Sequence, residues 1–245
     1  MLGERGELRL AEVAAMLQVS RPTAFRLLGS LQERGYVEHA RSEHVYRLGQ
    51  AVHVLAARAQ PDSLLRLAEP ALVHLRELSG ETTNLALLLR RSSIVYAAIL
   101  DGVHALRMSA EVGEKVPPHA TALGKAVLSV LPRDGAESLV GPEPFEKFTV
   151  NTMTHWSALE PELERVRERG YATDDEECDM GAYCIAGVIV GHDGLPVGGI
   201  SVSGLAARMS PESRVDLGQA VRDWCGQVSK QVSEARATRA SSPKG

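Results

Sequence analysis

The stretch SRPTAFRLLGSLQERGYV at residues 20–37 decides the fold of the first part of the chain. Ser20 is a favoured helix N-cap residue and Pro22 is tolerated in a first turn, so a helix is predicted from here to about Arg34. Gly35 follows at the position of a left-handed C-cap. The helical periodicity predicts a buried face made of Ala24, Leu27, Leu28 and Leu31.

A shorter amphipathic helix precedes this stretch. In LAEVAAML at residues 10–17, the apolar side chains follow the i, i+3, i+4, i+7 spacing of one helix face. Gln18 and Val19 form the turn between the two helices. Two short helices joined in this way are typical of a helix-turn-helix.

Two β-prone runs, at residues 36–39 and 45–48, follow the second helix and predict a hairpin. A helix-turn-helix followed by a hairpin is a winged helix, whose second helix lies in the major groove of DNA. Any helical hairpin followed by a strand pair gives a similar pattern, so the pattern alone leaves DNA binding open. Residues 1–49 hold seven Arg against six Glu, which permits binding to nucleic acid without demonstrating it.

The composition excludes several classes of protein. The 245 residues are 44% hydrophobic and 24% charged, which is unlike disordered, collagen-like or disulfide-scaffold chains. No apolar run reaches the ~18 residues of a membrane span, and no secretory signal is visible, so we expect a cytoplasmic protein. The three cysteines lack metal-ligand spacing, and no catalytic constellation or phosphate loop is visible. We therefore predict no catalytic residue, no metal and no cofactor.

The rest of the chain predicts a mixed α+β arrangement. A connecting helix runs from Gly49 to Gln60, and another helix from Asp62 to Gly80 is expected to be interrupted by Pro70. The predicted strands lie at residues 84–89, 93–100, 105–109, 184–190 and 197–203, and the remaining helices at residues 121–131, 159–169 and 210 to about 237.

Several phrases, in order along nearly the whole chain, resemble the IclR family of transcriptional regulators: SRPTAFRLLGSLQERGYV, GETTNLALL, VPPHATALGKAVLS, and GYATDDEECDMGAYCIAGVIV followed by GGISVSG. The resemblance implies an α+β fold with an N-terminal winged helix-turn-helix at residues 1–49 and a linker helix at 50–62. It further implies a C-terminal effector domain at residues 63–238, built on a GAF-like antiparallel sheet. Residues 239–245 are expected to form a disordered tail.

The resemblance also implies the residues that meet DNA. These are Ser20, Arg21, Pro22, Thr23, Ala24 and Arg26 on the second helix, with Arg41 and Arg47 near the wing. An Arg reaches guanine O6 and N7 or a phosphate, and a Thr meets a thymine methyl group. The alternative for Arg26 is that it covers the core or pairs with Glu33 or Glu12.

The effector pocket that the resemblance implies consists of Ala122, Leu123, Asp174, Ala182, Cys184, Ser201 and Ser203. Residues i and i+2 of a strand point to the same face, so Ser201 and Ser203 lie together. The free amides at the start of the helix near Thr121 favour a carboxylate. Alternatively, the acidic run at residues 174–177 is a solvated turn and the serines are ordinary sheet residues.

The resemblance thus implies a ligand-responsive regulator that binds operator DNA as a dimer or tetramer and takes a small carboxylate or aromatic acid. The alternative is a small-molecule sensor or adaptor without DNA binding. Only the residues MLGERGEL precede the helix at Leu10, where the family has a full helix. We therefore expect either a native start further upstream or an incomplete helical core that exposes part of the Ala24, Leu27 and Leu31 face.

Overall fold

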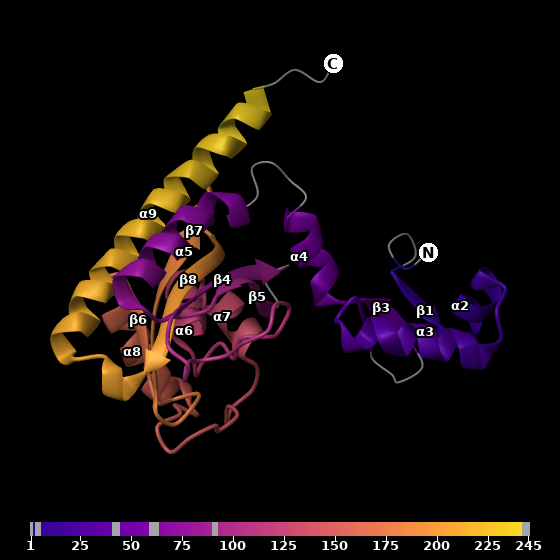
Figure 1. The fold of residues 1–245 in the computed structure, drawn as a ribbon, viewed down its shortest axis with the longest axis horizontal. Coiled ribbons are helices and arrows are strands. Elements are labelled where there is room, and N and C mark those ends of the chain that lie inside the picture. The colour runs from indigo at the N-terminus through magenta and orange to yellow at the C-terminus, as the bar shows by residue number, and fades with distance from the viewer. Residues whose placement is uncertain (1, 3–5, 41–44, 59–63, 90–92, 242–245) are drawn as a thin grey trace. The chain divides into compact units, whose positions relative to one another are not determined.

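The computed structural model of the chain describes residues 2, 6–40, 45–58, 64–89 and 93–241 (Figure 1). The chain forms two compact units, Met1–Gln60 and Pro61–Gly245. Within the described residues, no helix is both long enough and apolar enough to cross a membrane.

The N-terminal unit is a winged helix-turn-helix, as the sequence predicts. Helix α2 (Leu10–Leu17) and helix α3 (Arg21–Glu33) pack beside an antiparallel sheet of strand order β1-β3-β2, which consists of Glu7–Arg9, Val45–Leu48 and Val37–His39. Strand β1 was not predicted, because three residues are too few to show an alternating pattern. Helix α4 (Gln50–Arg58) follows the wing, and residues 59–62 of the predicted linker lie outside the described residues.

Helix α3 begins at the predicted cap. The Ser20 hydroxyl accepts a hydrogen bond from the Thr23 amide at 3.4 Å. Ala24 and Leu28 are buried against α2 and the small sheet, but Leu27 is 48% and Leu31 is 43% exposed. The prediction of burial is therefore wrong for Leu27 and Leu31. The elements that contact α3, mainly α2 and β2, cover only one narrow side of the helix.

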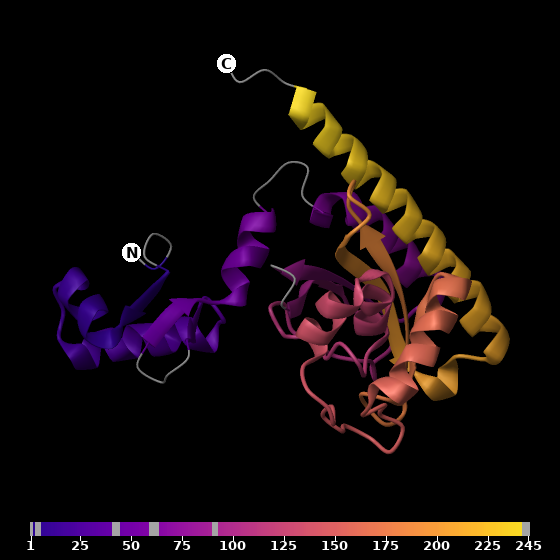
Figure 2. The same ribbon diagram turned by 180° about the vertical axis from the view of Figure 1, so that it is seen from behind.

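The C-terminal unit is built on an antiparallel sheet of order β5-β4-β8-β7-β6. Its strands are β4 (Thr82–Leu89), β5 (Ser93–Leu100), β6 (Ala172–Asp175), β7 (Ala182–Val190) and β8 (Pro196–Leu205). Helices α5 (Leu64–Ser79) and α9 (Pro211–Ser241) lie side by side on one face of the sheet, as Figure 2 also shows. Helices α6 (Ala122–Val130), α7 (Arg133–Val140) and α8 (Trp156–Arg169) build the apolar core on the other face.

Several details of this unit differ from the prediction. Pro70 lies inside a continuous α5, whose residues on both sides of the proline, including Ala68 and Leu72, are buried. Residues 105–109 form no strand; they belong to an irregular segment that covers the α6 face of the sheet. Strand β6 and helix α7 were not predicted.

The C-terminal helix is longer than the sequence predicts. It continues to Ser241, so residues 239–241 are helical and do not belong to a disordered tail. The remaining residues of the predicted tail, 242–245, lie outside the described residues. The sequence prediction ended the helix where the apolar stripe ends, but a helix can extend past its last packed residue through its own backbone hydrogen bonds.

Gly124 allows α6 to approach the preceding segment closely. A Cβ atom at this position would lie 2.2 Å from the carbonyl oxygen and 2.4 Å from the Cα atom of Pro118. Since both are backbone atoms, a side chain there must displace the helix. Gly124 therefore has a packing role.

Replacing Gly124 with alanine is expected to lower the free energy of unfolding by about 1 to 3 kcal/mol, the usual range for overpacking. Gly135→Ala in α7 is the matched control, because its nearest neighbour outside the helix would be a Leu131 methyl group at 3.6 Å. Urea unfolding measures both variants. Equal stability of the two variants would show that the close approach to Pro118 does not exclude a side chain at residue 124.

Candidate functional site

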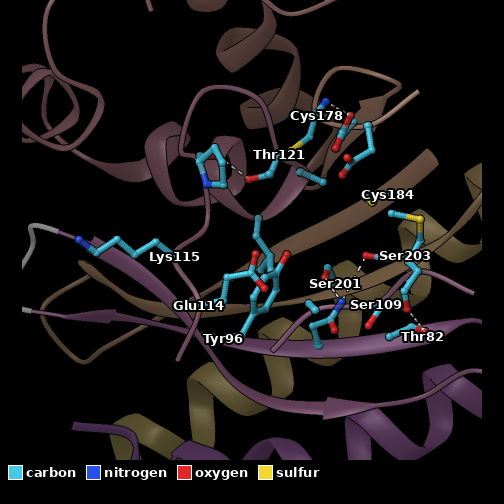
Figure 3. Close-up of a pocket in the computed structure, with 18 of the residues that line it drawn as sticks. Thr82, Tyr96, Ser109, Glu114, Lys115, Thr121, Cys178, Cys184, Ser201 and Ser203 are labelled. Carbon is cyan, nitrogen blue, oxygen red and sulfur yellow. Dashed lines mark hydrogen bonds between the residues drawn. The ribbon is translucent and has the colours of Figure 1, made fainter. Parts of the chain in front are cut away.

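A cavity of about 290 Å³ lies on the α6 face of the central sheet (Figure 3). Its floor is formed by side chains of β4, β5, β7 and β8 and its wall by the first turn of α6. Residues of the irregular segment after β5, including Met108, Ser109, Glu114 and Lys115, line it on another side. The cavity is therefore enclosed by parts of the chain that are distant in sequence.

Strand pairing aligns four of the lining residues in one row. Asp174 of β6 lies opposite Cys184 of β7, Cys184 opposite Ser203 of β8, and Ser203 opposite Thr82 of β4. Residues that lie opposite one another in a sheet point to the same face. This polar row, which we define as Asp174, Cys184, Ser203 and Thr82, crosses the sheet beneath the cavity.

Asn84 lies beside the polar row, opposite Ser201. Its side-chain amide donates hydrogen bonds to the hydroxyl oxygens of Ser201 at 3.1 Å and Ser203 at 3.2 Å. Both serine oxygens act as acceptors here, so their own protons point elsewhere. The Oδ1 atom of Asn84 is buried without a hydrogen-bond partner among the described residues. The amide thus fixes the two hydroxyls and keeps one acceptor unused.

The first turn of α6 contributes backbone donors. Thr121 is the N-cap, and its hydroxyl accepts from the Gly124 amide at 3.0 Å. The amides of Ala122 and Leu123 lie in the first turn, where no carbonyl of the helix is in position to accept from them. Both residues line the cavity, so their free amides and the positive end of the helix favour a negatively charged group there.

Asp174 is the buried carboxylate of the cavity, with 2% of its surface exposed. One oxygen, Oδ1, accepts from the Glu177 amide at 2.8 Å and the Cys178 amide at 3.4 Å. Burial raises the pKa of Asp174 to about 6, against the lowering effect of these amides and of Lys125. The group therefore titrates close to neutral pH.

The raised pKa of Asp174 makes stability depend on pH. Folding favours the protonated carboxyl, so this stabilisation is complete below about pH 4 and is lost as the pH rises through about 6. The shift from the ordinary value corresponds to roughly 3 kcal/mol. In the wild type, the free energy of unfolding should fall by roughly 3 kcal/mol between about pH 4 and about pH 6 because of Asp174. We expect this fall to be absent in Asp174→Asn, as measured by urea unfolding at several pH values. The exposed Asp175→Asn is the control, and an unchanged pH profile in Asp174→Asn would contradict the assignment.

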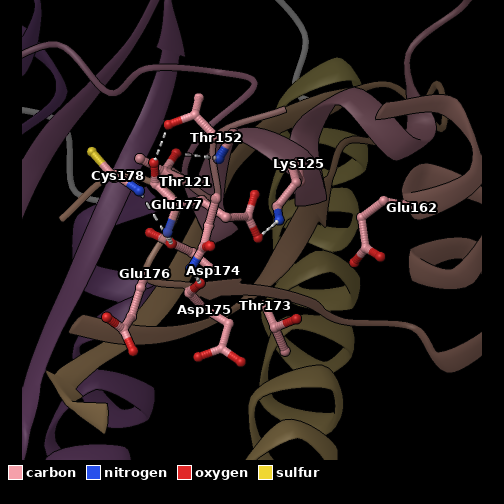
Figure 4. Close-up of polar contacts among 12 residues, drawn as sticks. Thr121, Lys125, Thr152, Glu162, Thr173, Asp174, Asp175, Glu176, Glu177 and Cys178 are labelled. Carbon is pink, nitrogen blue, oxygen red and sulfur yellow. Dashed lines mark hydrogen bonds and ion pairs between the residues drawn. The ribbon is translucent and has the colours of Figure 1, made fainter. Parts of the chain in front are cut away.

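A buried ion pair lies directly behind the cavity wall. The ammonium group of Lys125 in α6, fully buried, contacts the Glu177 carboxylate in the turn after β6 (Figure 4). Burial raises the pKa of Glu177 to about 7 in spite of Lys125, and the second carboxylate oxygen has no partner among the described residues. The pair connects the helix that supplies the backbone donors to the turn that holds Asp174.

The two thiols of the cavity are not nucleophiles. Burial is the main cause that raises the pKa of Cys178 to about 12 and that of Cys184 further still. Since the thiolate is the reactive form, both groups stay protonated and inert near neutral pH. The described residues also contain no group of three or more His, Cys, Asp or Glu side chains placed to hold a metal ion.

The structure brings together most of the pocket residues named from the sequence. The residues that line the cavity are Ala122, Leu123, Asp174, Cys184, Ser201 and Ser203. Ala182 does not line the cavity. It is the first residue of β7, and its amide donates to the Asp179 carbonyl in the preceding turn. The sequence reasoning missed Thr82, Asn84, Tyr96, Thr121 and Cys178. Polar residues inside the apolar run TTNLALLL were the available signal for the first two.

The predicted DNA-contacting residues fall into three groups. Ser20, Arg21, Pro22, Thr23 and Arg26 are exposed on α3. Ala24 is fully buried, so its assignment to DNA contact is wrong: it faces the core with Leu28, one turn further on. Arg41 lies outside the described residues, and Arg47 pairs with Glu38 at 2.7 Å.

Arg21 and Arg26 differ from Arg47 in having no carboxylate partner within the part of the chain that is described. The alternative pairing of Arg26 with Glu33 or Glu12 is therefore not observed; the Glu12 carboxylate instead accepts from the Arg9 amide at 2.7 Å. Two exposed guanidinium groups near the N-terminus of α3, with which no described carboxylate pairs, can bind phosphates or base edges.

Comparison with known proteins covers both units. The IclR helix-turn-helix domain matches residues 1–41, and the C-terminal domain of the bacterial transcriptional regulator IclR matches residues 57–230. The HTH-type transcriptional regulator KdgR of Escherichia coli is 34% identical over 212 residues, covering 86% of this chain and 80% of that protein. The transcriptional repressor IclR of Escherichia coli is 33% identical over 220 residues, with coverages of 88% and 80%. The crystal structure of the Thermotoga maritima IclR superimposes with a TM-score of 0.68 at 27% identity, covering 92% of this chain and 91% of that one.

Proposed function

Because the chain belongs to the IclR family of bacterial transcriptional regulators, we propose that it binds operator DNA as a dimer and that a small organic acid in the α6 cavity controls this binding. The family consists of DNA-binding regulators with an effector domain, and the chain is a regulator rather than an enzyme. We infer a cytoplasmic location, because the DNA that it regulates lies there.

The observation that carries the proposal is the exposed first turn of α3. No carboxylate of the described residues pairs with Arg21 or Arg26, and the hydroxyls of Ser20 and Thr23, which hydrogen-bond to each other at 2.9 Å, lie on the same turn. Phosphate contacts would position the helix, and base contacts would provide specificity. A dimer would present two such helices to two half-sites about one turn of DNA apart.

The cavity supports the second part of the proposal. It offers two fixed serine hydroxyls, the free amides of the first turn of α6 and a volume suited to a small molecule. An effector that binds one conformation of the dimer better than another would shift the equilibrium between them. That difference in affinity is the whole source of control.

The proposal is tested by fluorescence anisotropy of the chain titrated onto DNA from upstream of its own gene, with nonspecific competitor, at low and moderate salt. We expect competitor-resistant binding whose log affinity falls with log salt at a slope of about −0.9 per phosphate contacted. Binding without such a slope, or no binding, would favour a sensor or adaptor that acts through protein contacts. Sedimentation of the protein–DNA complex tests for two chains per site.

A further inference from the structure

The charges around the α6 cavity do not suit a simple anion. Three carboxylates line it, namely Glu114, Asp174 and Asp179, against one ammonium group, that of Lys115. Glu114, Asp179 and Lys115 are exposed, so water screens them, whereas Asp174 is buried. Lys125, the ammonium group behind the wall, is already paired with Glu177. An organic anion therefore meets one unscreened negative charge and no free buried cation among the described lining residues.

The polar groups on the sheet and on α6 that can donate a hydrogen bond to an anion are neutral. They include the hydroxyls of Ser201, Ser203 and Tyr96 and the first amides of α6, whereas the Thr121 hydroxyl already donates to the Pro117 carbonyl. Neutral donors stabilise a carboxylate, but they do not cancel the repulsion from a second carboxylate a few ångströms away at low dielectric constant. When two carboxylates share a buried site, they hold one proton between them.

We propose that an organic anion enters the cavity together with one proton, which Asp174 takes from solvent and uses to donate a hydrogen bond to the carboxylate of the effector. This inference rests on the proposed function, because it concerns how that effector is held. Oδ1 of Asp174 already accepts from two amides, so Oδ2 is the oxygen that carries the proton. One proton is bound for each anion bound, and no covalent bond changes.

The surroundings of Asp174 make this protonation accessible. The charged or titratable groups that act on it or line the same cavity are Lys125 from α6, Glu177, Cys178 and Asp179 from the turn after β6, Cys184 from β7, Tyr96 from β5, and Glu114 and Lys115 from the irregular segment. Burial outweighs the lowering effect of Lys125 and the two amides and raises the pKa of Asp174 to about 6. The thiols and Tyr96 have raised pKa values and hold their protons throughout this range.

The expected effect is a pH-dependent affinity. If only the protonated form of Asp174 accepts the anion, the apparent dissociation constant scales inversely with the protonated fraction. With a pKa of about 6, that fraction falls about 25-fold between about pH 5.5 and about pH 7.5. An uncharged ligand of the same shape meets no such repulsion, and its affinity should stay constant.

The test uses benzoate and its uncharged counterpart benzamide as probes of the full-length protein. Titration calorimetry at the two pH values, in buffers of different ionisation heat, gives both the affinity and the number of protons taken up. We expect benzoate to bind about 25-fold more tightly at the lower pH with uptake of up to one proton, and benzamide to bind equally at both. Asp174→Asn should remove the pH dependence for benzoate, and Asp175→Asn, which changes an exposed carboxylate outside the cavity lining, should retain it.

The outcomes separate this inference from the proposed function. Benzoate binding that ignores pH, or a pH dependence that survives in Asp174→Asn, overturns proton-coupled entry and leaves the organic-acid effector standing. If benzamide binds and benzoate binds at neither pH, proton-coupled entry and the organic-acid effector are both contradicted. If neither probe binds, the organic-acid site is contradicted, and this inference fails with it. DNA binding by the anisotropy assay is independent of all these results.

Discussion

Replacing Lys125 with methionine is expected to lower the free energy of unfolding by about 3 to 5 kcal/mol at about pH 8, because the Glu177 carboxylate would remain buried without its partner. The loss should be smaller at about pH 6, since Glu177, whose pKa is already about 7 beside Lys125, then becomes neutral by binding a proton. Urea unfolding at the two pH values measures the difference.

Two controls make this result specific. The double variant Lys125→Met with Glu177→Leu removes both charges and should recover much of the stability, because apolar residues often replace a buried pair without loss. Arg107→Met breaks a pair with Asp101 that is exposed on both sides and should change little. A Lys125→Met protein as stable as the wild type at the higher pH would show that the pair does not hold α6 in place.

Replacing Arg21 with alanine is expected to weaken operator binding by about 1 to 3 kcal/mol, or roughly 5- to 150-fold, if this residue reads a base. If it contacts a phosphate, binding should instead weaken similarly on all sequences and the salt slope should decrease by about 1. Anisotropy titrations on operator and unrelated DNA at two salt concentrations distinguish the two roles.

The matched control is Arg34→Ala, which removes the same charge from the opposite end of α3, at its C-cap. The two positions lie thirteen residues apart, or about 20 Å along a helix. Unchanged operator preference in Arg21→Ala, or an equal loss in Arg34→Ala, would refute a specific role for Arg21. Since Arg21 is exposed, the variant should fold normally.

Local features of the sequence predicted the elements that depend on local physics. The Ser20 cap, the turn at Gln18 and the start of α9 at Pro211 are set by neighbours in the chain, and the structure contains each of them. Periodicity alone predicts Leu27 and Leu31 as buried, because it identifies an apolar face but not what covers it, and both residues are exposed.

The candidate site shows the same limit over longer distances. Ser201 and Ser203 were recognisable as a pair on one strand face, but Asn84, which holds both hydroxyls, lies 117 residues from Ser201 in sequence. Lys125 and Glu177 are 52 residues apart, and nothing near either one indicates the other. Contacts of this kind follow from strand order and helix placement, which a single sequence does not specify.

The alternation of side chains along the strands has a consequence for which positions around the cavity can vary. Along β8, Ser201 and Ser203 face the cavity, whereas Ile200 and Val202, which alternate with them, are fully buried on the opposite sheet face. Substitutions at Thr82, Cys184 and Ser203 therefore alter the chemistry offered to a ligand without changing the packing beneath α5 and α9. Selection, natural or in a biosensor library, can vary these positions while the side chains beneath α5 and α9 stay constant.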